Sequence, residues 1–201
     1  MQKTSQRLIQ FLLLTGTVLF LSSFNTHNPT CLKTDNGYTI DWQNHYKLKP
    51  SDFKANKKWN LGNTVANTYS GFGYSITDND GKITGSIFVR FYCDKSWFKP
   101  NIDNAEDISY ILKHEQLHFD ICELFGRKMY KEILSLIRSN RLSQRNIDKI
   151  QLKLEKQYSN YQKAYDKETN HSINVNEQRR WEKKVENELV KLSAYADYTS
   201  F

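Results

Sequence analysis

Residues 111–120 read ILKHEQLHFD, and this stretch decides how the chain is interpreted. It lies in a segment from Ile108 to about Ser139 whose apolar residues recur at spacings of three and four, which predicts one long amphipathic helix. Four residues advance a helix by roughly 6 Å and 400°, so His114 and His118 share one face and can converge on a single ion. The stretch therefore predicts a metal site on a helix.

Glu115 directly follows the first histidine and completes the pattern His-Glu-x-x-His. Zinc accepts neutral imidazole nitrogen at about 2.0–2.1 Å. The glutamate lies beside such an ion, where its carboxylate can take a proton from an activated water and later pass it to a leaving nitrogen. We therefore expect Zn²⁺ at His114 and His118, with Glu115 as the catalytic base.

A catalytic zinc needs a third protein ligand and one open position. The chain has five histidines, of which His27 falls in a leader or linker and His45 is expected to be structural. His171 follows a tyrosine-rich helical segment, and we expect it to be the third ligand. Asp166 and Glu168 in the same segment are the alternatives.

Hydrolysis also needs a donor to the oxygen that becomes negative in the transition state. Tyr165 is expected to supply it, with Tyr161 as the alternative, since both lie in the segment after the histidine helix. Ordinary core packing is the competing interpretation of both tyrosines.

Angular position separates the other residues near the motif. At about 100° per residue, the side chains on the face away from the two histidines are Gln116, Asp120, Glu123 and Arg127. A polar structural cluster is expected there, with Glu123 and Arg127 forming an i,i+4 pair rather than Glu123 binding zinc. Asp120 is expected to contact helix or loop backbone, although it could also orient a zinc ligand.

A small β region is expected before the long helix. One short strand is predicted around Tyr38–Trp42 and a turn or helix start at Pro50. Alternating apolar residues in Phe72–Ile76 and Ile83–Phe91 flank the turn residues 78–81, which predicts a hairpin.

Two further helices are expected after the long one. Asp107 is the predicted N-cap of the long helix and Ser143 that of the second, and the third is expected after Asn176. The fold class is therefore α+β, with a small antiparallel β region followed by a long histidine-bearing helix and two packed helices.

The first 23 residues contain Lys3 and Arg7, and the segment from Leu8 to Phe24 is nearly all apolar. This pattern predicts an export signal, and its length is also at the lower limit for a membrane anchor. We expect residues 1–23 to be a signal peptide or anchor, 24–36 a linker and 37–201 a single domain. The domain is then extracytoplasmic: periplasmic, secreted or anchored on the outer side of the inner membrane.

Charge and cysteine content agree with an exported globular domain. Without the leader the formal charge falls from +7 to +5, a basic excess that suits an anionic envelope surface. An oxidising compartment allows a bridge between Cys31 and Cys93, and Cys122 is expected to be a small buried residue rather than a thiolate ligand.

Four segments resemble a known bacterial family, the "domain of unknown function 922" proteins, which are regarded as secreted zinc-dependent proteases. They are Trp42 with Leu48–Phe53, the pair Ser96-Trp97, HEQLHFDICE from His114 to Glu123, and YDKETNH from Tyr165 to His171. The resemblance implies a zincin-like fold in which a strand beside the active helix forms the edge of the cleft. Lys82–Tyr92 is the candidate, and an extended substrate adds to it as a further strand. This chain departs from the family by having Ser172 where glycine is usual.

The expected function is thus hydrolysis of a peptide or protein substrate by a metallopeptidase, most simply as a monomer. One rival is a non-catalytic envelope binding protein that retains the fold. The other is a basic module that binds surface polymers or polyanions. No nucleic-acid motif is present in the sequence, so nucleic acid is not an expected partner.

Overall fold

The computed structural model describes residues 30–35, 37–56, 65–99 and 104–201. The expected signal peptide or anchor at 1–23, His27 and most of the expected linker lie outside these ranges. The elements are β1 (Leu32–Thr34), β2 (Gly37–Asp41), the 3₁₀ turn η1 (Pro50–Asp52), β3 (Ala66–Asn67), β4 (Ser70–Asn79), β5 (Lys82–Tyr92), β6 (Trp97–Phe98), α1 (Ala105–Arg138), α2 (Gln144–Thr169), α3 (Val175–Lys191) and the 3₁₀ turn η2 (Ser193–Tyr195). This order confirms the α+β prediction.

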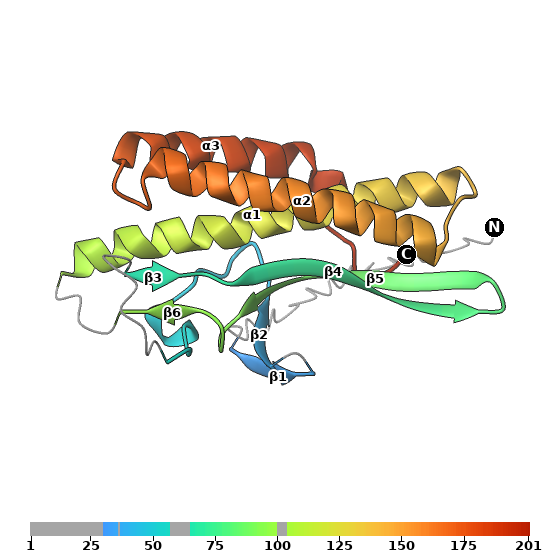
Figure 1. The fold of residues 1–201 in the computed structure, drawn as a ribbon, viewed down its shortest axis with the longest axis horizontal. Helices are drawn as coiled ribbons and strands as arrows, with labels where there is room; N and C mark the ends of the chain where they lie inside the picture. Colours follow the sequence, from blue (N-terminus) through green and yellow to red (C-terminus); the bar gives the residue numbers. More distant parts are fainter. Residues whose placement is uncertain (1–29, 36, 57–64, 100–103) are drawn as a thin grey trace, which may run out of the picture.

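The strands form two antiparallel sheets. One has the order β1-β2-β5-β4, and the other pairs β3 with β6. The predicted hairpin is confirmed, because β4 and β5 pair continuously and are joined by Asp80 and Gly81, whose φ angles are 52° and 85°. Figure 1 shows the three helices on one face of the strands, with α1 nearest to them.

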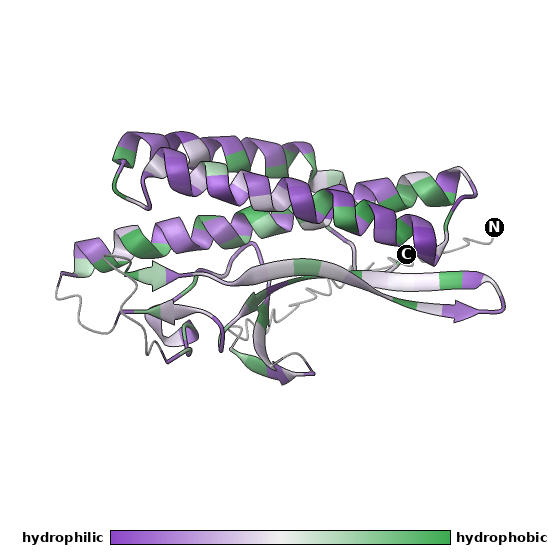
Figure 2. Cartoon of the chain, viewed as in Figure 1, coloured by the Kyte–Doolittle hydropathy of each residue, from purple (hydrophilic) through white to green (hydrophobic). Residues whose placement is uncertain are grey.

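Aromatic side chains hold α1 against the four-stranded sheet. The rings of Phe72 and Phe125 stack with centroids 6.1 Å apart, and those of Phe91 and Phe119 are 5.8 Å apart. A Cβ atom at Gly126 would lie 2.4 Å from a methyl carbon of Val89, so glycine permits this close approach of helix and strand. Figure 2 shows that most residues of α2 and α3 are hydrophilic, as expected for helices that pack on α1 from one side.

The helix boundaries correct two predictions. The side chain of Asn104 accepts a hydrogen bond from the backbone N–H of Glu106 and caps α1, so Asp107 lies in the first turn. Ser143 caps α2 as predicted, whereas α3 begins at Val175 with Asn174 as its cap. No helix among the described residues is long and apolar enough to cross a membrane.

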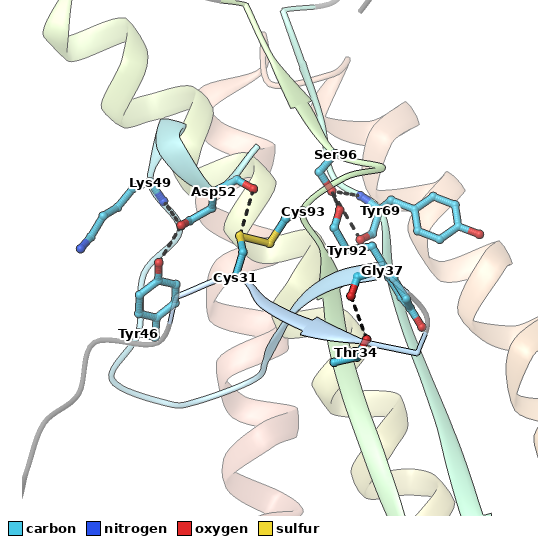
Figure 3. Close-up of a disulfide and its surroundings, with 10 residues drawn as sticks. All are labelled: Cys31, Thr34, Gly37, Tyr46, Lys49, Asp52, Tyr69, Tyr92, Cys93 and Ser96. Carbon is cyan, nitrogen blue, oxygen red and sulfur yellow. Dashed lines mark hydrogen bonds between the residues drawn. A yellow bond between two sulfur atoms is a disulfide. The ribbon is translucent and has the colours of Figure 1, made fainter. Parts of the chain in front are cut away.

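Residues expected to be linker contribute to the sheet. Within 24–36, strand β1 pairs with β2, and Cys31 forms a disulfide with Cys93, the bridge that an oxidising compartment would allow (Figure 3). The same view shows Asp52 accepting hydrogen bonds from the Tyr46 hydroxyl at 2.7 Å and the Lys49 N–H at 2.8 Å. These bonds fix the turn that begins at Pro50. Part of the expected linker thus belongs to the four-stranded sheet.

Candidate metal centre

Three side chains of ligand type meet between α1 and α2. The Nε2 atoms of His114 and His118 are 3.2 Å apart. Oδ1 of Asp166 lies 3.4 Å from Nε2 of His114 and 3.1 Å from Nε2 of His118. Their ligand atoms all lie within 4.8 Å of one another, so within the described ranges this trio can hold a metal ion.

Two glutamine side chains fix the orientation of the imidazoles. Gln162 on α2 donates its amide N–H to the His118 carbonyl oxygen at 2.9 Å, so its Oε1 faces Nδ1 of His118, 2.6 Å away. Gln178 on α3 donates to Glu182 at 3.0 Å, so its Oε1 faces Nδ1 of His114, 3.1 Å away. An amide oxygen only accepts, and both Nδ1 atoms must therefore carry the proton.

The consequence is an electron-rich centre. With Nδ1 protonated, each neutral imidazole directs the lone pair of Nε2 toward the other ring and toward Asp166. Two lone pairs 3.2 Å apart beside a carboxylate repel one another unless a cation or a shared proton lies between them. The donor set of two imidazoles and one carboxylate is one that zinc uses in enzymes.

The electrostatics of Asp166 and His118 agree with this description. Burial raises the pKa of Asp166. When a shared proton rather than a metal cation lies between the rings and the carboxylate, Nε2 of His114 and of His118 can donate to Asp166, which outweighs burial and holds this pKa well below its usual range. Burial lowers the pKa of His118. The hydrogen bond with Asp166 and the charge of Glu115 outweigh burial, and the pKa of His118 is therefore raised. Asp166 is thus an anion placed to bind positive charge.

Glu115 lies beside the trio rather than in it. Its side chain is buried, and its Oε2 has no hydrogen-bond partner among the described residues. A buried carboxylate oxygen without a partner is costly, so its presence indicates a site where a water or ligand completes the bonding. Glu115 also lines a cleft of about 770 Å³ together with His114, His118 and Asp166.

The structure places Asp166, one of the two alternatives, where His171 was expected. His171 lines the same cleft but has 71% of its side chain exposed, and its Nδ1 is 3.8 Å from Oδ1 of Asp166. Glu168 instead accepts hydrogen bonds from Arg180 and Trp181 on α3. His45 is exposed on the loop after β2, away from the trio.

Tyr165 has a supporting position rather than the expected one at the reacting carbonyl. Its ring is fully buried and stacks on His114, with centroids 4.6 Å apart. Its hydroxyl donates to Gln178 Oε1 at 2.7 Å and approaches the His114 carbonyl oxygen at 3.2 Å. Tyr161 points toward α3 and donates to Glu188. The packing interpretation therefore fits both tyrosines, and the tyrosines that line the cleft are Tyr69 and Tyr158.

The edge of the cleft is also not the expected strand. Strand β5 lies between β2 and β4. Beyond the part that pairs with β2, Gly85 exchanges backbone hydrogen bonds with Phe201 and the N–H of Ile87 donates to the carbonyl of Tyr198. The segment Val65–Ser70, which contains β3, lines the cleft instead. The Thr68 hydroxyl donates to the Glu115 carbonyl oxygen at 3.2 Å and joins this segment to α1. A strand covered on both sides cannot accept a substrate strand.

The opposite face of α1 carries the predicted polar cluster. Glu123 and Arg127 form the expected pair at 2.7 Å, and both are buried. Asp120 accepts from the Trp42 indole at 2.8 Å and from Gln116 at 2.9 Å, so it binds side chains rather than backbone. These contacts fasten the loop after β2 to α1, away from the metal ligands.

Cys122 is fully buried and is the free cysteine of the described residues, as expected of a packing residue. Burial raises the pKa of its thiol, so it is a poor metal ligand. Gln162 and Gln178 were missed at the sequence level, because glutamine is not a common metal ligand and only tertiary packing brings α2 and α3 beside the imidazoles.

Comparison with known families supports the resemblance. A family model described as "Bacterial protein of unknown function (DUF922)" matches residues 103–172, about a third of the chain. The matched segment contains the His-Glu-x-x-His pattern and Asp166. Neither the curated proteins nor the solved structures contain a match to this chain.

Proposed function

Given that residues 103–172 match the DUF922 family, we propose that this protein is a zinc-dependent peptidase with a zincin-like fold. In this proposal His114, His118 and Asp166 hold the metal and Glu115 is the general base. The observation that carries it is the convergence of two imidazole lone pairs and one carboxylate within 4.8 Å, beside a buried glutamate oxygen with no partner among the described residues.

The residues present fit a bound Zn²⁺. Zinc in such a site lowers the pKa of a coordinated water toward about 7 and polarises a carbonyl group. Gln162 and Gln178 keep the two rings in the tautomer that offers Nε2. The unpartnered oxygen of Glu115 takes a proton from the attacking water and delivers it to the departing amine nitrogen.

The substrate class is an extended peptide. Strand β3 pairs with β6 on one side, with Ala66 opposite Phe98 and Asn67 opposite Trp97. The segment Val65–Ser70 faces the cleft beside Glu115. A peptide that lies along this segment gains backbone hydrogen bonds and presents successive carbonyl groups to the centre.

An extracytoplasmic location fits the same chemistry. The disulfide between Cys31 and Cys93 persists in oxidising compartments, and the apolar segment after Lys3 and Arg7 has the pattern of an export signal. The protein is therefore proposed to act outside the cytoplasm on envelope or extracellular peptides.

Metal analysis combined with hydrolysis of fluorescence-quenched random peptides tests this function. The wild-type protein is expected to bind one zinc per chain and to cleave part of the library in a chelator-sensitive manner. Alanine at His114, His118 or Asp166 is expected to remove most of the zinc. Glu115→Gln should keep the zinc and lose about 10²–10⁴-fold in rate. Glu186→Gln, at an exposed position of α3, is the control.

Two results would count against it. Full zinc without cleavage by the wild-type protein would favour a non-catalytic envelope binding protein. Absence of zinc, together with a salt-dependent affinity for polyanions that chelator does not change, would favour a polyanion-binding module.

A further inference from the structure

Three consecutive residues after α2 have a left-handed backbone, although none is glycine. The φ angles are 49° at Asn170, 51° at His171 and 75° at Ser172. A single left-handed residue, commonly asparagine or glycine, is enough to end a helix, and Asn170 fills that position. The two residues that follow therefore hold an unfavourable conformation that the helix end does not require, and such strain concentrates at functional sites.

Backbone hydrogen bonds keep this conformation in place. The N–H of His171 donates to the Asp166 carbonyl at 2.9 Å, and the N–H of Asn174 donates to the Thr169 carbonyl at 2.8 Å. Thr169 is itself fully buried, and its hydroxyl donates to the Tyr165 carbonyl at 2.7 Å. The loop is thus fastened to the part of α2 that carries Asp166.

The loop holds the His171 ring at the mouth of the cleft. The ring is 71% exposed, lines the cleft with Glu115 and lies 3.8 Å from Asp166. It is outside the trio that can hold a metal ion. An exposed imidazole held beside the centre by strained backbone is suited to contact what enters the cleft.

We propose that His171 is a catalytic residue that donates a hydrogen bond to the carbonyl oxygen of the peptide bond being cleaved, and that it is not a metal ligand. This inference rests on the proposed peptidase function. As the water oxygen bonds to the carbonyl carbon, the carbonyl oxygen gains negative charge, which an N–H donor stabilises. The C–N bond then breaks, and the amine takes the proton held by Glu115. His171 keeps its own proton throughout, so it contributes a donor without net proton transfer.

Measurements on the metal-loaded protein separate this role from that of a ligand. His171→Ala is expected to retain one zinc per chain and, after cobalt substitution, an unchanged visible spectrum. Its kcat on quenched peptides should fall about 10²–10³-fold with little change in KM, because the contact strengthens in the transition state. A phosphinic peptide, which mimics the tetrahedral geometry, should bind more weakly by a similar factor. His171→Gln, which keeps an N–H donor, should recover part of kcat.

The control is His45→Ala, since that histidine is exposed and outside the cleft. Loss of zinc or an altered cobalt spectrum in His171→Ala would show that His171 is a ligand and overturn the inference. Unchanged kcat in an active enzyme would overturn the inference alone and leave the peptidase proposal intact. A wild-type protein that binds zinc but cleaves no peptide would overturn both.

Discussion

Gln162 binds His118 at two points. Its amide nitrogen donates to the backbone carbonyl of His118 at 2.9 Å, and its amide oxygen lies 2.6 Å from Nδ1 of the same residue. A side chain from α2 therefore sets both the position and the tautomer of His118, a proposed metal ligand on α1. Rotation of the imidazole would break the contact at Nδ1, while the bond to the backbone carbonyl holds Gln162 in place.

Gln162→Met tests this relationship. The thioether keeps the volume but lacks the oxygen that accepts from Nδ1, so the ring loses its fixed tautomer. Zinc affinity, measured by competition with a chelator of known Kd, is expected to fall about 10–100-fold. Gln157→Met, at an exposed position of the same helix, is the matched control and should leave the affinity unchanged.

Tyr165→Phe distinguishes a supporting tyrosine from one that acts on substrate. The variant keeps the ring stacked on His114 and removes only the hydroxyl that donates to Gln178. We expect a loss of about 0.5–1.5 kcal/mol in the free energy of unfolding and a kcat within a few-fold of the wild type. Urea unfolding and peptide hydrolysis check the two parts. A loss of 10²-fold or more in kcat at unchanged zinc content would instead restore the role in oxyanion binding.

Ser172→Gly should stabilise the protein. The Cβ atom of serine is sterically strained at a φ of 75°, and glycine has no Cβ atom. The free energy of unfolding is therefore expected to rise by up to about 1 kcal/mol. Thermal unfolding measures the change. Ser159→Gly makes the same substitution inside α2, where helical φ angles prevail, and should lower stability by about 0.5–1 kcal/mol.

Glu123 is expected to make stability depend on pH. Burial raises its pKa from 4.5 to about 7, against hydrogen bonds from Tyr198 and Arg127. Between those values the folded protein holds a proton that the unfolded chain has lost, so the free energy of unfolding falls as pH rises through the window and is level above it. Urea unfolding of Glu123→Gln at pH 5 and 8 should lack this component. Glu132→Gln, a partly exposed glutamate on the same helix, should retain it.

Removing the disulfide should destabilise the domain through the unfolded state. Cys31 and Cys93 are 62 residues apart, and closing a loop of that length is worth about 4 kcal/mol in the chain-entropy model. The double variant Cys31→Ala with Cys93→Ala is expected to unfold at lower urea concentration, with a free energy of unfolding lower by about 4 kcal/mol. The wild-type protein under strong reductant is the parallel measurement, and similar stability of the oxidised and reduced forms would contradict the prediction.

The local sequence pattern was sufficient to predict the helices and the shared face of the two histidines. Spacings of three and four placed His114 and His118 on one face of α1, and alternation across the turn at residues 78–81 predicted the hairpin of β4 and β5. Both features depend on residues close in sequence, which is why they could be predicted without tertiary information.

The carboxylate beside the two histidines and the edge of the cleft depend on contacts between distant segments. Asp166 is four residues after Gln162 and shares its helix face, whereas the left-handed turn at Asn170 carries His171 away from that face. The sequence identified Asp166 and His171 as candidate ligands, but it did not predict the direction of the turn at Asn170. Likewise, the resemblance suggested Lys82–Tyr92 as the edge of the cleft, and only the pairing of β5 with β2 and with the segment Tyr198–Phe201 shows that it is covered.

The proposed metal ligands lie on α1 and α2, and the amides that orient the two imidazoles come from α2 and α3, so the candidate site depends on the packing of all three helices. If the proposed zinc binds, mass action adds RT ln(1 + [Zn²⁺]/Kd) to the stability of that packing, about 2.7 kcal/mol when free zinc is 100 times Kd. As free zinc falls, the free energy of unfolding of the three-helix packing would then decrease even while part of the protein still holds the ion. If the protein acts outside the cytoplasm as proposed, its resistance to proteolysis there would follow the local zinc supply.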